Sequence, residues 1–444
     1  MFKRVLIANR GEIALRISRA LRNLGCEVAI IHGREDRLSL PVRFSDIAVS
    51  NYTKNPLDSY LDYESVITAA KKIGAEAIHP GYGFLAENAA FVKRCEEEAI
   101  TFIGPSSNVI SLLGDKIEAR RAMEEAGLPV AKGSSEPISS VKDAKKIAIE
   151  IGYPVIIKAA AGGGGIGMQI VHEEDEFESA LNICQSRASS AFGDERVFVE
   201  KYIEGAQHVE FQVLADGNRA IHFGERFCSI QRRHQKLLEE GPWLSDEVRA
   251  EIGSRVCAGA EAVGYKGLAT FEFLRDVHGK FYFLEVNPRV QVEHTVTEMI
   301  TGYDLVSLGI RVAAGEPLTL NQEDIRIFGH AIQCRINAED PVKFAPSPGR
   351  LWDCHFPTGF GIRVDTHAHI GYEMPGCFDS LLAKMIVWGR TREDAIASMK
   401  TALSETVLVG VDTVIPLHKK ILDEPDYLDR KITIQYLEEH PDLI

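Results

Sequence analysis

The sequence predicts a protein of two or three domains, with an α/β fold in the N-terminal part and an α+β fold in the remainder. The chain has 444 residues, which is more than one hydrophobic core usually organises. Expected strands and helices alternate up to about residue 110, whereas between residues 115 and 330 expected strands follow one another through tight turns. From about residue 331 short strands mix with helices. The expected domains are therefore residues 1–114, 115–330 and 331–444.

The N-terminal part has the pattern of a doubly wound parallel sheet. The apolar stretch KRVLIA predicts a buried strand, apolar residues recur at helical spacing from Ile13 to Leu24, and Gly25 precedes a second strand, EVAIIH. Helices near residues 62–73 and 87–98 and strands at AEAIHP and ITFIG continue the pattern. The segment NRGEIA lacks the GxGxxG fingerprint, so a Rossmann-type dinucleotide cofactor is not expected.

The central part predicts an α+β domain and the last part a turn-rich, mixed one. The expected central strands are RVFVEKYI, HVEFQVLA, RAIHFGERF, LATFEFL and KFYFLEVN. Tight turns such as ADGN and DVHGK join them, which favours antiparallel pairing. After residue 331 the pattern predicts helices near residues 391–405 and 413–423, among many prolines and glycines.

Composition and charge argue against several classes of protein. The formal net charge of −14 argues against a nucleic-acid partner, although one cleft can be positive on a negative chain. The eight cysteines are scattered singly, so neither a zinc site nor a disulfide framework is expected. The apolar run in MFKRVLIANR is too short for a signal peptide, and no stretch approaches the length of a membrane span. A cytoplasmic protein without membrane contact is expected.

A glycine-rich segment, GGGGIGM, follows the expected strand YPVIIKAA. Glycines allow backbone N–H groups to approach phosphate oxygens, and Lys158 would add a positive charge beside them. The segment does not fit GxxxxGK[ST], which excludes a Walker-type loop. A phosphate-binding loop and a flexible linker both remain open on this pattern alone.

The segment FYFLEVNPRVQVEH carries a more specific pattern. A period of two places Glu285, Asn287, Arg289, Gln291 and Glu293 on one face. Pro288 cannot donate to a strand ladder, so the alternation is more secure for Glu285 and Asn287 than beyond them. Glu272 is likewise the polar residue between Phe271 and Phe273. Carboxylate and amide oxygens are ligands that suit Mg²⁺, so the pattern favours a magnesium site. The alternative interpretation is a sheet face that is exposed to solvent.

Two further segments are rich in polar side chains. HVEFQVLA alternates, with His208, Glu210 and Gln212 on one face. The segment FCSIQRRHQKLLEE brings four basic or imidazole side chains into five positions: Arg232, Arg233, His234 and Lys236. This cluster would attract an anion, or it forms a solvated basic face.

In this order along the chain, the motifs resemble those of the biotin carboxylases, a family with the ATP-grasp fold. The resemblance covers nearly the whole chain: IANRGEIA, HPGYGFLAEN, FIGP, GDK, IIKAAAGGGGIGM, VEKYIE, QHVEFQVLADG, CSIQRRHQK, TFEFL, EVNPRVQVEHTVTEMITG and CRINAED. It implies an N-terminal parallel-sheet domain, a central ATP-grasp domain with a mobile glycine-rich lid at about residues 131–203, and a mixed C-terminal domain.

The resemblance also implies which residues bind ATP. The implied phosphate ligands are Lys116 and Lys158, with Gly164 and Gly165 in the lid that keeps water from the activated intermediate. The implied adenine-holding segment is Glu200, Lys201, Tyr202 and Ile203, and the implied further nucleotide contacts are His208, Gln231 and His234. Glu272, Glu285 and Asn287 match the ligands of Mg²⁺ or Mn²⁺, in agreement with the strand alternation.

The remaining implied roles concern bicarbonate and biotin. The residues that match the bicarbonate pocket are Lys236, Arg289, Gln291 and Val292. Glu293 matches the general base, Arg335 the arginine at the biotin ureido oxygen, and Tyr82 lines the same side. The chain has no biotin-attachment segment, so the resemblance implies a separate biotin carrier protein and a separate carboxyltransferase, and the family commonly forms homodimers.

Two other interpretations compete with this one. Another ATP-grasp ligase, such as a carbamoyl-phosphate-forming enzyme, would share the nucleotide and metal residues but would not be expected to keep RVQVEH together with CRINAED. A non-catalytic nucleotide-binding scaffold would be free to lose Glu293 and Arg335. The sequence departs from the family pattern at Ile166 in the lid and at Phe227, where an aspartate is common, and both put nucleotide affinity in doubt.

Overall fold

The computed structural model describes residues 1–134, 136–138, 140–162 and 167–443. Its N-terminal layer is a five-stranded sheet in the order β3-β2-β1-β4-β5, and every pairing in it is parallel. The strands are β1 (Arg4–Ile7), β2 (Glu27–His32), β3 (Ile47–Ser50), β4 (Ala77–His79) and β5 (Thr101–Phe102). The predicted parallel sheet is confirmed, but β3 was missed, because it lacks the continuous apolar run by which the other strands were recognised.

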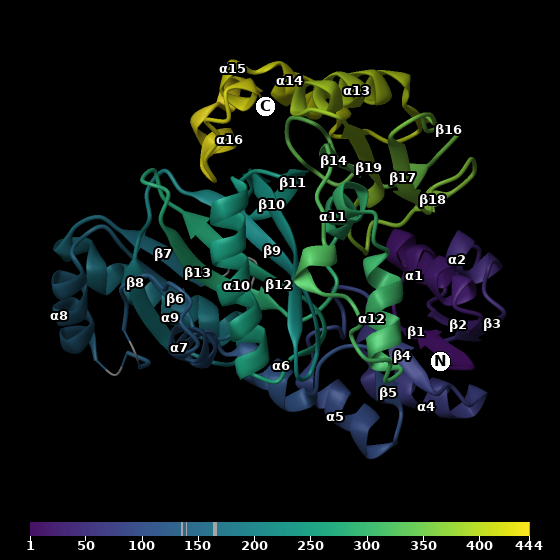
Figure 1. The fold of residues 1–444 in the computed structure, drawn as a ribbon, viewed down its shortest axis with the longest axis horizontal. Helices are drawn as coiled ribbons and strands as arrows, with labels where there is room; N and C mark the ends of the chain where they lie inside the picture. The colour runs from purple at the N-terminus through teal and green to yellow at the C-terminus, as the bar shows by residue number, and fades with distance from the viewer. Residues whose placement is uncertain (135, 139, 163–166, 444) are drawn as a thin grey trace.

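Helices cover this sheet, as the purple and blue part of Figure 1 shows. They are α1 (Gly11–Asn23), α2 (Leu40–Arg43), α3 (Asp58–Leu61), α4 (Tyr63–Ile73), α5 (Ala89–Glu97) and α6 (Ser107–Gly114). Local signals set their ends: the Asp62 side chain accepts from the Ser65 N–H at the start of α4, and Gly74, with φ of 66°, ends that helix. The helices predicted near residues 62–73 and 87–98 are therefore confirmed.

The largest sheet has eight strands in the order β13-β12-β9-β10-β11-β14-β19-β17, all antiparallel. They are β9 (Gln207–Asp216), β10 (Ala220–Arg232), β11 (Gln235–Gly241), β12 (Lys266–Arg275), β13 (Phe281–Asn287), β14 (His330–Asn337), β17 (Ile362–Thr366) and β19 (Leu381–Gly389). The sheet continues from strands before residue 331 to strands after it. The expected domain boundaries remain predictions.

Helices pack on this large sheet, and some of them close its main hydrophobic core. They are α7 (Lys116–Glu125), α10 (Asp246–Ala262), α11 (His294–Thr301), α12 (Leu305–Ala313) and α13 (Arg392–Glu405), with the short η2 (Gln322–Asp324) following α12. The core is rich in fully buried aromatic side chains, among them Phe211, Phe271 and Phe273. Because these phenylalanines alternate with polar residues along β9 and β12, one face of the sheet is apolar and the other carries the polar groups described below.

A smaller three-stranded sheet, β7-β6-β8, forms the lobe at the left of Figure 1. It contains β6 (Val155–Ala159), β7 (Met168–Val171) and β8 (Val197–Lys201), with α8 (Val141–Ile151), η1 (Glu174–Glu176) and α9 (Phe177–Phe192). This lobe has a hydrophobic core of its own, which includes Val155, Phe177 and Val199. It falls within the segment that the sequence predicted to be the lid.

The C-terminal part adds two small ribbons and a run of helices that returns to the central sheet. The ribbons are β15 (Gly349–Arg350) with β18 (Glu373–Met374) and β16 (Asp353–His355) with β20 (Val407–Val409). The helices are α14 (Ile415–Asp423), α15 (Pro425–Leu428), α16 (Tyr436–Glu439) and η3 (Pro441–Leu443). The Ile434 N–H donates to the Ala206 carbonyl at 2.9 Å, which fixes the yellow chain end of Figure 1 over the start of β9.

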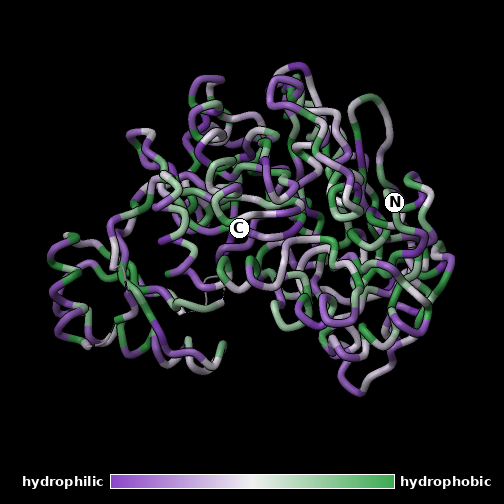
Figure 2. Tube along the Cα trace, turned by 60° about the horizontal axis from the view of Figure 1, so that its bottom comes forward, coloured by the Kyte–Doolittle hydropathy of each residue, from purple (hydrophilic) through white to green (hydrophobic). Residues whose placement is uncertain are grey.

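Hydrophobic and hydrophilic stretches alternate along the whole trace in Figure 2. In the described part of the chain, no helix combines the length and the apolar character that crossing a membrane requires.

Candidate active site

A cleft of about 630 Å³ opens between the three-stranded lobe and the polar face of the central sheet, and the returning C-terminal segment forms part of its wall. Most of the predicted site residues line it: Lys116, Lys158, Glu200, Lys201, Tyr202, Ile203, His208, Gln231, His234, Lys236, Glu272, Glu285, Asn287, Arg289, Gln291, Val292, Glu293 and Arg335. Tyr82 is not among the lining residues in the described part of the chain. Gly164 and Gly165, and with them Ile166, lie outside the described residues.

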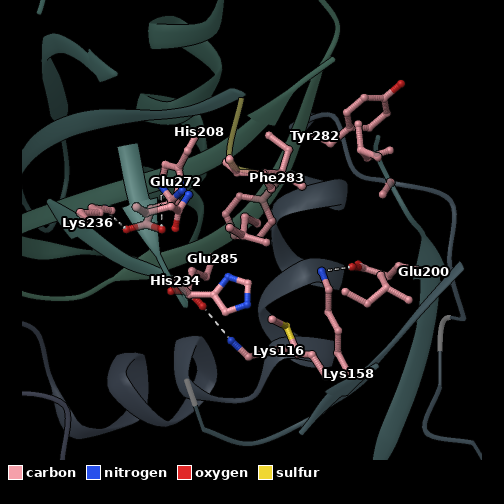
Figure 3. A pocket seen from close by; sticks show the side chains of 18 of the residues that line it. Lys116, Lys158, Glu200, His208, His234, Lys236, Glu272, Tyr282, Phe283 and Glu285 are labelled. Atoms are coloured by element: carbon pink, nitrogen blue, oxygen red, sulfur yellow. Dashed lines mark hydrogen bonds and ion pairs between the residues drawn. The ribbon is translucent and has the colours of Figure 1, made fainter. Parts of the chain in front are cut away.

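The lobe end of the cleft holds a carboxylate between two cations. In the β6–β8 pair Ile156 lies opposite Glu200, and Lys158 is two residues further along β6. Lys158 Nζ donates to Glu200 Oε2 at 2.5 Å, and Arg120 Nε lies 3.3 Å from the other carboxylate oxygen (Figure 3). Arg120 also lines the cleft. The sequence analysis missed it, because an arginine on an amphipathic helix carries no motif of its own.

The chain that joins the lobe to the central sheet is pinned by Lys201. Its Nζ donates to the carbonyls of Gly152 and Tyr153, both at 3.0 Å. The Tyr202 hydroxyl accepts from Gln435 Nε2 at 2.8 Å, so the C-terminal segment is tied to the same stretch. These contacts fix the backbone of residues 201–203, where the sequence predicted that a nucleobase is held.

Lys116 lies at the start of α7 and reaches the centre of the cleft. Its Nζ donates to Glu285 Oε2 at 2.7 Å (Figure 3), while its own N–H is held by the Ala160 carbonyl at 3.0 Å. Burial acts to lower the pKa of Lys116, but the charge and hydrogen bond of Glu285, with the charges of Glu272 and Glu200, together raise it above its usual value. Lys116 is therefore a firmly charged cation at neutral pH.

Three carboxylates lie abreast across neighbouring strands. Glu272 on β12 pairs in register with Glu210 on β9 on one side and with Glu285 on β13 on the other. Glu210 and Glu272 are only 0% and 5% exposed, so this is not a solvent-exposed sheet face. The prediction from strand alternation is confirmed in its geometry for Glu272 and Glu285, which come from directly opposed positions.

Lys236 on β11 neutralises much of this negative charge. Its Nζ lies 2.9 Å from Glu272 and 2.8 Å from Glu293, and it also contacts Glu210. Burial acts to lower the pKa of Lys236, but the surrounding carboxylates raise it well above its usual value. His208 Nε2 adds a second cation 3.0 Å from Glu272, since its pKa rises to about 9: burial lowers it, and the charge of Glu272 together with the interactions of Glu210 and Glu272 with the ring more than compensates.

The donor atoms on β12 and β13 fit a divalent metal ion. Asn287 Nδ2 donates to Glu272 Oε1 at 2.9 Å, so the amide is held beside the two opposed carboxylates of Glu272 and Glu285. Carboxylate and amide oxygens of this kind suit Mg²⁺. In a different group of close donors, His208, Glu210 and Glu272, both carboxylates already bind the Lys236 ammonium.

Beyond Asn287 the strand ends, as Pro288 predicted, and residues 288–293 form a loop that leads into α11. Arg335 on β14 reaches this loop, with Nη2 3.1 Å from Glu293 Oε2, and Glu239 Oε1 accepts from Arg335 Nε at 2.6 Å. Arg289 Nη2 donates to Asn287 Oδ1 at 2.9 Å. The loop therefore brings a carboxylate and one guanidinium group to the cleft, and β14 brings a second guanidinium group to that carboxylate.

Glu293 is 2% exposed and is charged at neutral pH. Burial acts to raise its pKa, but the charge of Lys236 lowers it, with smaller contributions from Arg335 and Arg226, and the net pKa is below its usual value. A buried carboxylate that stays ionised between cations can accept a proton from a ligand in the cleft.

Two buried residues behind the site were missed by the sequence analysis. Arg226 is 0% exposed and its guanidinium bonds Glu210, Gln212, Thr297, Thr270 and Gln291. Glu239, also 0% exposed, holds Arg335. Neither stood out in the sequence, because Arg226 follows Glu225 and Glu239 precedes Glu240. Phe227, the departure from the family pattern, stacks on Trp243 with ring centroids 3.8 Å apart.

Three family models match the chain in succession. Residues 1–110 match the biotin carboxylase N-terminal domain, residues 115–321 the ATP-binding domain of the carbamoyl-phosphate synthase L chain, and residues 333–439 the biotin carboxylase C-terminal domain. The central model alone would leave open the ligase interpretation weighed from the sequence. The two flanking models favour the biotin carboxylases.

Similar proteins agree over the full length. The chain is 49% identical over 443 residues to a biotin carboxylase from Haemophilus influenzae. The alignment covers 99% of this chain and 98% of the relative. It is also 49% identical to biotin carboxylase 1 from Bacillus subtilis, over 99% of this chain and 98% of the relative. The biotin carboxylase domain dimer of Hydrogenobacter thermophilus 2-oxoglutarate carboxylase, solved with MgADP, ADP and bicarbonate, matches with a TM-score of 0.97 at 50% identity, over 100% of this chain and 98% of that one. The chain belongs to the biotin carboxylase family, with the ATP-grasp fold.

Proposed function

We propose that the protein uses ATP and bicarbonate to carboxylate biotin on a separate carrier protein, giving carboxybiotin, ADP and phosphate. One observation carries the proposal. Glu293, an ionised base, lies between Lys236 and Arg335. It lines the same cleft as Lys116 and Lys158. The similar Hydrogenobacter thermophilus domain was solved with MgADP and bicarbonate.

Lys116, Lys158 and the 201–203 segment would bind the nucleotide. The two ammonium groups would lie along the phosphates, and the fixed backbone of residues 201–203 would hold the base, with Glu200, His208, Gln231 and His234 completing the nucleotide site. The lid glycines Gly164 and Gly165 would cover the phosphates. Glu272, Glu285 and Asn287 would hold Mg²⁺ or Mn²⁺, which when bound neutralises phosphate charge.

Bicarbonate would occupy the end of the cleft formed by Lys236, Arg289, Gln291 and Val292. Glu293 would take the bicarbonate proton as a bicarbonate oxygen attacks the γ-phosphorus of ATP and the bond to ADP breaks. The product is carboxyphosphate. A general base of this kind contributes a factor of about 10²–10⁴ in rate.

Biotin would then be carboxylated at the same end of the cleft. Carboxyphosphate breaks down to CO₂ and phosphate, the phosphate takes the N1′ proton of biotin, and N1′ forms the new bond to CO₂. Arg335 and Arg289 would stabilise the negative charge on the ureido oxygen, and Tyr82, which hydrogen-bonds Glu12, would support the same side.

The carrier protein and a carboxyltransferase on other chains belong to this proposal, as does a homodimer, which the similar Hydrogenobacter thermophilus domain forms. The acyl acceptor would be chosen by the transferase. The cytoplasmic location expected from the sequence stays a prediction.

ADP formation with bicarbonate, Mg²⁺ and free biotin tests the proposal. We expect biotin to stimulate ADP release, and Glu293→Gln to abolish most of it while ATP binding, measured by calorimetry, persists. Glu251→Gln, on the exposed face of α10, is the matched control and should keep full activity. ATP binding without bicarbonate-dependent turnover would favour the scaffold, and carbamoyl phosphate formation with ammonia would favour the other ligase class.

A further inference from the structure

The loop that carries Glu293 contains a β-turn, and two of its carbonyl groups are bound by buried side chains. The His294 N–H donates to the Gln291 carbonyl at 3.3 Å, which closes a turn over residues 291–294. Glu293, with φ of −85° and ψ of 6°, has the backbone angles of the third residue of a type I turn. The central residues of this turn are therefore Val292 and Glu293.

Two buried side chains bind the two successive carbonyls of the turn. His294 Nδ1 lies 2.7 Å from the Gln291 oxygen, and Lys384 Nζ donates to the Val292 oxygen at 3.0 Å. Both side chains are 0% exposed. We refer to His294 and Lys384 as the carbonyl clamp.

The clamp determines which way the N–H groups of the turn face. A trans peptide is planar, so the carbonyl of one residue and the N–H of the next point in opposite directions. Because the Gln291 and Val292 carbonyls point toward buried side chains, the N–H groups of Val292 and Glu293 point the other way, toward the cleft that both residues line. Within the described part of the chain, no protein group accepts from either N–H.

The protonation of His294 suits this role. A carbonyl can only accept, so Nδ1 must carry the hydrogen. Burial, and then the positive charges of Lys384, Arg16 and Arg363, hold the pKa of His294 well below its usual value, so the ring stays neutral with this tautomer throughout the physiological range.

Lys384 is held in turn by residues from other parts of the chain. Its Nζ lies 3.1 Å from Glu12 on α1 and 3.9 Å from Asp365 on β17. Glu12 also accepts from the Tyr82 hydroxyl at 2.5 Å. One ammonium group thus connects the N-terminal layer and the C-terminal strands to the backbone beside Glu293.

We propose that His294 and Lys384 are positioning residues which turn the Val292 and Glu293 N–H groups toward the bound bicarbonate. The inference rests on the proposed function and deepens it: bicarbonate is recognised by backbone donors whose direction is set by the carbonyl clamp. The side chain of Gln291 is fixed separately, between Arg226 and Glu272 at 2.9 and 2.7 Å, so the clamp acts on the backbone alone.

A matched pair of substitutions at His294 tests this role. Asparagine places its Nδ2 donor the same number of bonds from the backbone as Nδ1 of histidine, whereas glutamine places its donor one bond further. We expect His294→Gln to raise the KM for bicarbonate about five- to tenfold, the effect of losing one hydrogen bond, with the KM for ATP unchanged. His294→Asn should restore the bicarbonate KM to near the wild-type value, and exposed His278→Gln is the control.

Lys384 is tested with a variant that avoids a stranded charge. Lys384→Met alone would leave Glu12 unpaired in the interior, so the double variant Glu12→Gln/Lys384→Met is compared with Glu12→Gln. The double variant should raise the bicarbonate KM above that of Glu12→Gln, because only the double variant loses the donor to the Val292 carbonyl.

The outcomes separate the two proposals. Wild-type protein without bicarbonate-dependent ADP formation would overturn the proposed function. An active wild type, with the same bicarbonate KM in His294→Gln and in His294→Asn, would overturn the carbonyl clamp alone. An equal rise in the KM for bicarbonate and in the KM for ATP, together with a lower unfolding midpoint, would also overturn it, because it would show a purely structural role.

Discussion

His208 links the stability of the protein to pH, because it is buried beside two carboxylates. Its Nε2 lies 3.0 Å from Glu272 and 3.7 Å from Glu210. Burial lowers the pKa of His208, but the charge of Glu272 and the interactions of Glu210 and Glu272 with the ring together raise it, to about 9 from an ordinary value of 6.5. Moving the pKa from 6.5 to about 9 corresponds to about 3 kcal/mol of stabilisation.

The sign follows from the direction of the shift. The pKa is higher in the folded state than in the unfolded state, so the stabilisation is fully present below about pH 6.5 and is lost as the pH rises through about 9. His208→Asn removes the titrating group. The difference in free energy of unfolding between wild type and His208→Asn should therefore shrink by about 3 kcal/mol between about pH 6 and pH 10.

Urea unfolding of both proteins, followed by circular dichroism across this pH range, measures the difference. Exposed His278→Asn is the control and should differ little from wild type at any of these pH values. A difference for His208→Asn that stays constant from pH 6 to pH 10 would refute the reasoning, because it would show that His208 is not charged in the folded protein.

Three further outcomes are expected from the site and its surroundings. Glu285→Gln removes one oxygen donor and the partner of Lys116, so the Mg²⁺ concentration for half-maximal ADP formation should rise at least about tenfold; an unchanged titration would remove Glu285 from the metal site. Arg335→Lys loses the planar guanidinium, and biotin-stimulated ADP release should fall about 10²-fold in a steady-state assay while bicarbonate-dependent release without biotin persists. Phe227→Ala removes a fully buried ring stacked on Trp243 and should cost about 3–5 kcal/mol in urea unfolding, with the KM for ATP unchanged; a raised KM would connect this departure to the nucleotide site.

The sequence predicted the parallel sheet and the antiparallel central strands, because buried strands and polar positions at period two leave a direct trace in the residue order. Glu272 and Glu285 could be placed on one face for this reason, and their registered pairing agrees. Most of the cleft lining was predicted from the resemblance to the biotin carboxylases instead. The eight-stranded sheet that runs from β13 to β17 could not be predicted, since pairing of β11 with β14 joins segments about a hundred residues apart. Pairing partners are set by tertiary packing rather than by local pattern.

The charges that support the site were hidden for a related reason. Arg226 follows Glu225 and Glu239 precedes Glu240 in the sequence, so neither stands out as a lone charge, and what each one bonds depends on strands far away in the chain. The clamp residue Lys384 is the clearest example, because nothing in LLAKMIVWG indicates that its ammonium group binds a carbonyl beside Glu293. A buried charge in an apolar strand predicts that a partner exists but not which one.

The central eight-stranded sheet brings together residues that fall in two different family models. The family model that the chain has in common with carbamoyl-phosphate synthase spans residues 115–321, which contain Lys116, Lys158, the proposed metal ligands and Glu293. Arg335 lies beyond that model, in the biotin carboxylase C-terminal match, and reaches Glu293 only because β14 pairs with β11, the strand that carries Lys236. Since Lys236 and Arg335 hold the same carboxylate from adjacent strands, the step that activates bicarbonate and the step that would use biotin share one charged group.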